Sequence, residues 1–309
     1  MQAENTVMNA ADWQTGFAER HQLPDTYLDY AQQWFAPLAT RISAHQDGAG
    51  GAILVGVNGS QGSGKTTVCD YLRENLAACH GKRAVSLSLD DFYLTREERS
   101  RLALEVHPLF ATRGVPGTHD MDLLASTVAA LLDAKEGRGV PVPRFDKALD
   151  DRKPLEAWEQ VPGPVDVVLL EGWCLGARPA TAEALSRPVN ELERLEDAEG
   201  GWRNYVNEEV RRKFEPMYRR IDRWIMLCAP SFDCVYRWRR EQEHKLALAS
   251  STKRGTRVMN DEQLARFIQF YERLTRQCLD DLPSRVHHLY QLDARRRVIG
   301  ETHTESPVQ

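Results

Sequence analysis

The segment Gly59–Thr66, which reads Gly-Ser-Gln-Gly-Ser-Gly-Lys-Thr, has the residue types and spacing of a polyphosphate-binding loop. Glycines let the backbone approach a phosphate closely and direct several N–H groups at it. The lysine supplies positive charge at the β- and γ-phosphates, and the Thr66 hydroxyl is placed to bind Mg²⁺. The bland alternative is a Gly/Ser loop with an incidental lysine. The apolar run Ile53–Val57 before the loop and the amphipathic helix after it favour nucleotide binding. The residues assigned to the nucleotide are Gly59, Ser60, Gln61, Gly62, Ser63, Gly64, Lys65, Thr66 and Thr67.

Two acidic positions follow other predicted strands. Asp90 and Asp91 come after Ala84–Leu89, and Glu171 comes after the apolar run Val165–Leu170. The carboxyl ends of parallel strands share one edge, where the ligand lies, so these acids should flank the loop. Phosphoryl transfer to an alcohol needs Mg²⁺, cations and a carboxylate that accepts the hydroxyl proton. We expect Asp91 to cap a turn or helix; the alternative that neither aspartate is catalytic stays open.

The elements that must position these groups alternate between helices and short β-branched runs, which predicts an α/β P-loop NTPase fold with a mainly parallel sheet and helices on both faces. Residues 1–50 are expected to form a helical extension packed on the core, with one leading helix over Asp25–Ala44 that ends in the glycine-rich segment His45–Gly51. The kinase-like domain follows over 51–299, with a surface insertion at 176–201, a helical lid at about 230–256 and a disordered tail at 300–309. The acidic run of the insertion is read as a solvated face rather than a metal site.

Further elements are predicted from periodicity and capping residues. They are a helix from Lys65 to Cys79 ending at Gly81, a helix opened by the capping box Thr95–Glu98, a helix over Met121–Leu132, a helix to about Arg219, a strand over Trp224–Cys228, helices over Phe232–Ala249 and Asp261–Leu279, the latter capped by Asn260, and a strand over His288–Leu292.

Composition narrows the function class. The formal charge of −5 gives no general basic field for nucleic acid or anionic membranes. The chain has no run of about 18 apolar residues, and its N-terminus lacks the charged and apolar regions of an export signal. Six cysteines without Cys-x-x-Cys spacing are read as reduced thiols. We expect a cytoplasmic enzyme with a small-molecule substrate and no nucleic-acid or membrane partner; the oligomeric state is not determined.

Three segments resemble the phosphoribulokinase, uridine kinase and pantothenate kinase branch of P-loop kinases. They are Asp90–Tyr93 (Asp-Asp-Phe-Tyr), Val142–Arg152 (Val-Pro-Arg-Phe-Asp-Lys-Ala-Leu-Asp-Asp-Arg) and Val167–Trp173 (Val-Val-Leu-Leu-Glu-Gly-Trp). Three more are similar to D-glycerate 3-kinase and its kinase-like relatives: Arg113–Asp120, Glu171–Gly176 and Val235–Arg239. The resemblance covers about residues 53–282.

This resemblance implies roles for individual residues. Asp90 would be the general base, and Glu171 would position Mg²⁺ or its waters or assist at the substrate. Arg237, Arg239 and Arg240 would belong to a lid whose arginines close over the phosphates and exclude water. The alternative for these arginines is a solvated helix face paired with Glu241 and Glu243.

The acceptor is suggested by three positions at which this sequence differs from the nucleoside kinases. Where those kinases have an apolar residue, a tyrosine and a histidine, this chain has Arg144, Phe145 and Asp150. Arg144, Arg113 and His119 would suit a small carboxylate, because a guanidinium can bind one with two charge-assisted hydrogen bonds. Arg144 could instead brace Asp146 or Asp150. By the same resemblance Tyr93 and Arg152 lie on the substrate side.

These residues favour an ATP- and Mg²⁺-dependent kinase that converts D-glycerate, a hydroxy acid, to 3-phosphoglycerate. The alternatives are a kinase for a nucleoside, pantothenate or another sugar acid, and a regulatory or chaperone-type P-loop NTPase. No Asn-Lys-x-Asp segment is present to read guanine. The residues that contact adenine are not identifiable from the sequence.

Overall fold

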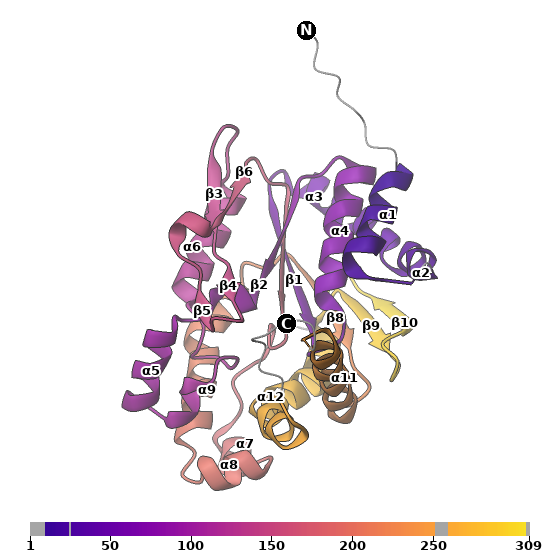
Figure 1. The fold of residues 1–309 in the computed structure, drawn as a ribbon. Helices are drawn as coiled ribbons and strands as arrows, with labels where there is room; N and C mark the ends of the chain where they lie inside the picture. Colours follow the sequence, from indigo (N-terminus) through magenta and orange to yellow (C-terminus); the bar gives the residue numbers. More distant parts are fainter. Residues whose placement is uncertain (1–9, 25, 251–258, 307–309) are drawn as a thin grey trace.

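The computed structural model describes residues 10–24, 26–250 and 259–306, and it has a six-stranded sheet between two layers of helices (Figure 1). The strand order is β10-β9-β8-β1-β7-β2. Five strands are parallel, and β10 runs antiparallel to β9 at the edge. The strands of this sheet are β1 (Ile53–Gly59), β2 (Ala84–Ser88), β7 (Val167–Gly172), β8 (Arg223–Cys228), β9 (His288–Leu292) and β10 (Val298–His303). The predicted fold class is confirmed.

Parallel pairing brings the chemically important strand ends together. Every residue of β1 and of β7 is buried, as expected for interior strands covered on both faces. Glu171 near the end of β7 pairs with Val57 on one side and with Ser88 on the other. The phosphate loop, Glu171 and the segment after β2 therefore leave the sheet at one edge, as the sequence predicts.

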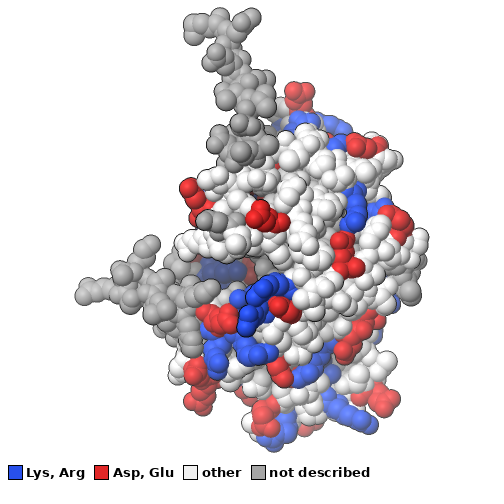
Figure 2. Space-filling model, turned by 90° about the vertical axis from the view of Figure 1, so that its right-hand side faces the viewer, with Lys and Arg blue, Asp and Glu red and all other residues white. Residues whose placement is uncertain are grey.

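Helices cover the sheet in two layers with separate cores. Buried side chains of the N-terminal helices and α4 pack on one face, and those of α6, α9 and α12 pack on the other. The helices are α1 (Ala10–His21), α2 (Thr26–Trp34), α3 (Ala36–Ala49), α4 (Lys65–His80), α5 (Arg96–Glu105), α6 (Met121–Leu132), α7 (Ala182–Ser186), α8 (Glu191–Glu196), α9 (Gly201–Glu209), α10 (Glu215–Tyr218), α11 (Phe232–Ser250) and α12 (Asp261–Asp281). Of the helices described, none is long and apolar enough to cross a membrane. Basic and acidic side chains are interspersed on the face drawn in Figure 2.

Local signals in the sequence place several helix ends correctly. Thr95 and Glu98 form the predicted capping box of α5, and Asn260 caps α12 through a capping box with Gln263. Gly81 ends α4 in the left-handed conformation with φ 64°. These motifs are confirmed because each depends only on residues within one turn.

The two ends of the chain differ from the prediction. The single helix expected over Asp25–Ala44 is two helices, α2 and α3, and α3 continues to Ala49. The break lies just before Pro37, which fits the first turn of a new helix but not a helix interior. α1, which precedes them, was not predicted.

The prediction that the chain is disordered from residue 300 onward is wrong for the described residues, because β10 continues to His303. The Glu301 carboxylate pairs with Arg41 of α3, and the Val298 N–H donates to the Tyr30 hydroxyl at 2.8 Å. β10 is a largely exposed edge strand, so its residues carry little apolar periodicity for a sequence to reveal.

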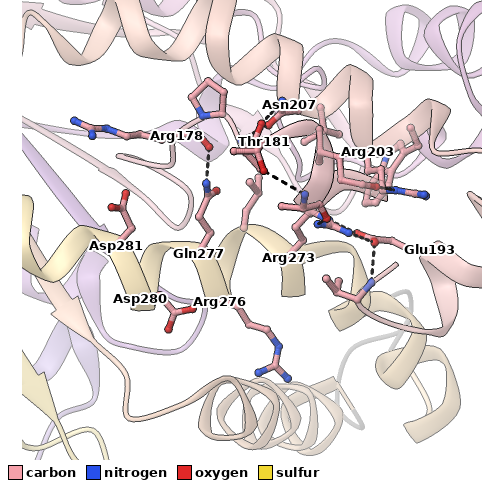
Figure 3. Close-up of a pocket in the computed structure, with 18 of the residues that line it drawn as sticks. Arg178, Thr181, Glu193, Arg203, Asn207, Arg273, Arg276, Gln277, Asp280 and Asp281 are labelled. Carbon is pink, nitrogen blue, oxygen red and sulfur yellow. Dashed lines mark hydrogen bonds and ion pairs between the residues drawn. The ribbon is translucent and has the colours of Figure 1, made fainter. Parts of the chain in front are cut away.

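The insertion at 176–201 carries α7 and α8 against α12. The expectation of a solvated acidic face is wrong for two of its acids, since Glu193 is 1% exposed and Asp197 is 2% exposed. Glu193 pairs with Arg273 of α12, and Asp197 pairs with Arg203 of α9. Figure 3 shows the first pair beside a cavity of about 520 Å³ between the insertion, α9 and α12.

The pair between Glu193 and Arg273 should hold the insertion on the domain. Arg273→Met removes the cation that neutralises a buried carboxylate, so the free energy of unfolding should fall by about 3–5 kcal/mol in urea titrations. Arg194→Met removes a neighbouring exposed pair with Glu191 and should leave the unfolding midpoint unchanged. Equal effects of the two variants would contradict this account.

Candidate active site

The phosphate loop connects β1 to α4 with the conformation that its glycines allow. Gly62 and Gly64 have φ of 78° and 89°, in the left-handed region. A Cβ on Gly62 would lie 2.7 Å from Cβ of Trp238 on α11, and one on Gly59 would lie 2.5 Å from Oγ of Ser63. Glycine is therefore required at Gly62 by both its backbone conformation and the close approach of α11.

Several polar atoms in this loop are buried without a partner. The hydroxyls of Ser60 and Ser63 and Oε1 of Gln61 have no hydrogen-bond partner among the described residues. Buried polar groups are normally hydrogen-bonded, so orphaned atoms in a phosphate cradle are consistent with a bound polyphosphate as the missing partner. The loop residues thus fit the nucleotide phosphates expected from the sequence.

A carboxylate and a hydroxyl beside the loop fit Mg²⁺. The Thr66 hydroxyl donates to Oε1 of Glu171 at 2.9 Å, and Nζ of Lys65 lies 3.8 Å from Oε2. Glu171 is 3% exposed, and its Oε2 accepts no hydrogen bond from the described residues. Mg²⁺ in kinases is commonly held by one or two protein oxygens together with phosphate oxygens and water. No cluster of three or more His, Cys, Asp or Glu that could hold a metal occurs in the described part of the chain.

Asp90 lies in a short 3-10 helix directly after β2, with both carboxylate oxygens engaged. Oδ1 accepts a hydrogen bond from the Tyr93 hydroxyl at 2.8 Å, and Oδ2 accepts one from Nζ of Lys147 at 2.7 Å. Burial alone would raise the pKa of Asp90, but the Lys147 ammonium, assisted by Lys65 and the Tyr93 hydroxyl, holds it well below its usual range. Asp90 is therefore ionised at neutral pH.

Lys147 is the site residue that sequence reasoning missed. It lies in the turn between two short antiparallel strands, β4 (Phe145–Asp146) and β5 (Asp151–Arg152), which were not predicted either. The Lys147 side chain is 62% exposed, whereas Tyr93 is 4% exposed. The sequence could have drawn attention to Lys147 because it lies in the segment 142–152, which carries the family resemblance. No local sequence pattern, however, indicates that it pairs with an aspartate 57 positions away.

Three of the predicted substrate residues gather around Asp90. The ring of His119 lies 4.6 Å from that of Tyr93, and burial lowers the pKa of His119 to about 4, so it is neutral at pH 7. The Arg113 guanidinium lies 5.4 Å from the ring of Phe145 and pairs with Asp150. The result is an aromatic cluster that lies beside two ion pairs, Asp90 with Lys147 and Asp150 with Arg113.

The other two predicted substrate residues are occupied by structural contacts. Arg144 pairs with Asp91 and Glu159 rather than with the Asp146 or Asp150 considered from the sequence. Arg152 donates to the Tyr93 carbonyl at 2.9 Å and to Asp120 at 3.0 Å.

Asp91 also differs from expectation. It caps no helix or turn of its own segment; instead, it accepts the Phe145 N–H at 3.1 Å as well as the Arg144 guanidinium. Asp91 thereby attaches the hairpin that carries Lys147 to the end of β2.

The predicted lid corresponds to α11, and residues 251–258 of that region lie outside the described residues. Arg239 pairs with Glu243, as in the alternative reading, and lies 5.4 Å from the Phe267 ring. Glu243 is 4% exposed, so this pair is not on a solvated helix face. Arg237 and Arg240 are exposed, and Arg237 donates to Sγ of Cys234 at 3.0 Å. Contact of these arginines with phosphate stays a prediction.

Comparison of the sequence with protein families matches residues 54–177 to the phosphoribulokinase/uridine kinase family. D-glycerate 3-kinase, chloroplastic, of Arabidopsis thaliana is 31% identical over 229 residues, covering 71% of this chain and 46% of that protein. The chain thus spans about half the length of the Arabidopsis protein. The uncharacterized kinase mug58 of Schizosaccharomyces pombe is 33% identical over 229 residues, covering 72% of this chain and 79% of that protein.

Solved structures agree with this relationship. D-glycerate 3-kinase from Cryptococcus neoformans matches with a TM-score of 0.75 at 26% identity, over 88% of this chain and 98% of that one. The YGR205w protein, at 24% identity and a TM-score of 0.65, shares the fold over 99% of this chain and 100% of its own. Together with the phosphate loop and the acids beside it, these similarities show that the chain belongs to the phosphoribulokinase/uridine kinase family of P-loop kinases.

Proposed function

We propose that this chain transfers the γ-phosphoryl group of Mg-ATP to a hydroxyl of D-glycerate and forms 3-phosphoglycerate. The observation that carries the proposal is the ionised Asp90 at the end of β2, which accepts a hydrogen bond from the exposed Lys147. A carboxylate acceptor suits a site with two cations around an aromatic cluster, because charge-assisted hydrogen bonds favour an anion there. D-glycerate 3-kinases among the relatives and structural matches support the same choice.

Each group has a role in the proposed reaction. Asp90 accepts the proton of the attacking hydroxyl, while Lys65 and the backbone of the phosphate loop stabilise the phosphoryl group as it moves. Thr66 and Glu171 would hold Mg²⁺, which when bound neutralises charge on the phosphates. Arg113 and Lys147 would bind the acceptor carboxylate in exchange for their present partners, Asp150 and Asp90. Lid arginines would exclude water, which competes as an acceptor.

Lys147 also controls the basicity of Asp90 in this proposal. While its ammonium is bonded to Asp90, both carboxylate oxygens are engaged and the pKa of Asp90 is low, so Asp90 is a poor proton acceptor. The acceptor carboxylate offers Lys147 another partner. Because Tyr93 is buried and Lys147 is exposed, the lysine is the partner that leaves. The base is then released only when an anionic acceptor is bound.

The cytoplasmic location of the reaction stays a prediction.

The acceptor is tested by ADP release from Mg-ATP with D-glycerate, L-glycerate, uridine, cytidine, pantothenate, ribulose 5-phosphate or no acceptor. D-glycerate alone should stimulate turnover. Asp90→Asn should lower kcat by roughly 10²–10⁴-fold while ATP binding persists, because the variant lacks the base. Stimulation by another acceptor would overturn the assignment of D-glycerate as the substrate. Retained transfer in Asp90→Asn would overturn the assignment of Asp90 as the base. Slow turnover that does not depend on an acceptor would favour an NTPase.

The role of Lys147 is tested with Lys147→Met. Without the ammonium the pKa of Asp90 rises. As the pH is lowered, kcat/KM of the variant should therefore begin to fall at a higher pH than kcat/KM of the wild type. The KM for D-glycerate should rise about tenfold or more, with the KM for ATP unchanged. Lys153→Met, which alters an exposed lysine following β5, is the matched control and should change neither. An unshifted pH profile in Lys147→Met would contradict the role.

A further inference from the structure

The cavity of about 520 Å³ between the insertion, α9 and α12 has no part in the reaction proposed above. The residues that line it all lie within 178–207 and 270–281, outside the phosphate loop and the segments that carry Asp90, Glu171 and Lys147. Its volume is within the range of about 300–1,000 Å³ that is usual for small-molecule sites. The cavity is therefore large enough to be a separate binding site.

Apolar side chains form much of its wall. Leu185 of α7, Val206 of α9, and Phe270 and Leu274 of α12 line the cavity, and all four are buried. Trp202 of α9 also lines it, and its ring centroid lies 5.7 Å from that of Phe270. Two aromatic rings among aliphatic side chains favour a ligand with flat apolar surface.

Two polar groups on this wall lack a partner. The indole N–H of Trp202, a residue 3% exposed, donates to no acceptor among the described residues. Gln277 extends from α12 toward Arg178, and its Nε2 donates to the Arg178 carbonyl at 2.7 Å (Figure 3). Its buried Oε1 accepts no hydrogen bond from the part of the chain described. Buried polar groups are normally hydrogen-bonded, so one free donor and one free acceptor indicate a ligand that offers an acceptor and a donor.

The charges around the cavity cancel. Arg203 pairs with the buried Asp197 at 2.9 Å, and Arg273 pairs with the buried Glu193. The other charged residues that line the cavity carry two charges of each sign: Arg178, Arg276, Asp280 and Asp281. A charged ligand would lose its hydration without gaining an unpaired countercharge, so the wall favours an uncharged one.

The two helices that wall the cavity also support the segment 113–120. On α12, Tyr271 follows the lining residue Phe270, and its hydroxyl donates to the Arg113 carbonyl at 3.3 Å. On α9, Tyr205 precedes the lining residue Val206, and a Cβ on Gly117 would lie 3.1 Å from the Tyr205 ring. A ligand held between α9 and α12 would therefore restrain both supports of this segment.

We propose that this cavity is a second ligand site, which binds a small uncharged aromatic molecule carrying a hydrogen-bond acceptor and a donor, as a carboxamide does. The acceptor receives the Trp202 N–H, and the donor bonds to Oε1 of Gln277. Occupancy of the site restrains the segment 113–120. The inference is independent of the phosphoryl acceptor, because neither the cavity nor its contacts involve Asp90 or Lys147.

The site is tested by ligand-observed NMR titration of the full chain with benzamide. Ala184→Phe enlarges an exposed residue of α7 that lines the cavity, so it should weaken benzamide binding about tenfold or more. Ala182→Phe adds the same bulk to an exposed residue of the same helix outside the cavity, and should bind like the wild type. Failure of the wild type to bind benzamide, or equal affinities of the two variants, would overturn the site.

The chemistry of the ligand is tested with toluene and benzoate. Both should bind the wild type more weakly than benzamide, since toluene lacks the polar groups and benzoate is charged. Gln277→Met removes the free acceptor, so it should weaken benzamide about tenfold and leave toluene unchanged. Equal weakening of the two ligands would show that Gln277 only shapes the cavity, and tighter binding of benzoate would overturn the choice of an uncharged ligand.

The effect on the segment 113–120 is tested by hydrogen exchange, which requires no enzymatic activity. Saturating benzamide should slow exchange of the amides in this segment in the wild type, because α9 and α12 are both restrained. Ala184→Phe should show no such change at the same benzamide concentration. Unchanged exchange in a wild-type protein that binds benzamide would overturn the link between the cavity and this segment.

Discussion

Parallel pairing of β2, β7 and β1 is the constraint on which the site depends. Glu171 lies beside both Ser88 and Val57, so the acid, the phosphate loop and Asp90 emerge at one edge although they are distant in the chain. The register is held by apolar runs buried on both faces. A slip of one residue would exchange the faces to which the side chains of β7 point and remove Glu171 from Thr66 and Lys65.

Aromatic side chains from late in the chain pack against two glycines in loops, one in the phosphate loop and one in the segment 113–120. Trp238 of α11 packs on Gly62 of the phosphate loop. Tyr271 of α12 packs on Gly114, where φ is 140° and a Cβ would lie 2.3 Å from the tyrosine hydroxyl oxygen. The α11–α12 pair therefore contacts the nucleotide side and the acceptor side together, and displacement of these helices would alter both.

Charge at the site is balanced by partners that differ in exposure. Glu171 is buried beside Thr66, which donates a hydrogen bond to it, and beside the ammonium of Lys65. One carboxylate oxygen of Asp90 accepts a hydrogen bond from the buried Tyr93, and the other accepts one from the exposed Lys147. A carboxylate with one fixed and one displaceable partner can act as a general base whose pKa changes when substrate binds.

Sequence by itself determined the features that depend on neighbouring residues: the phosphate loop, the capping boxes of α5 and α12, the buried strands, and the acids at strand ends. Tertiary structure alone decided the partnerships between distant segments. Lys147 meets Asp90, Arg144 meets Asp91, Glu193 is buried against Arg273, and β10 adds to β9. The physical reason is range. Capping and hydrophobic periodicity act within a few residues, whereas an ion pair or an edge strand forms only after packing has brought remote parts of the chain within a few ångströms.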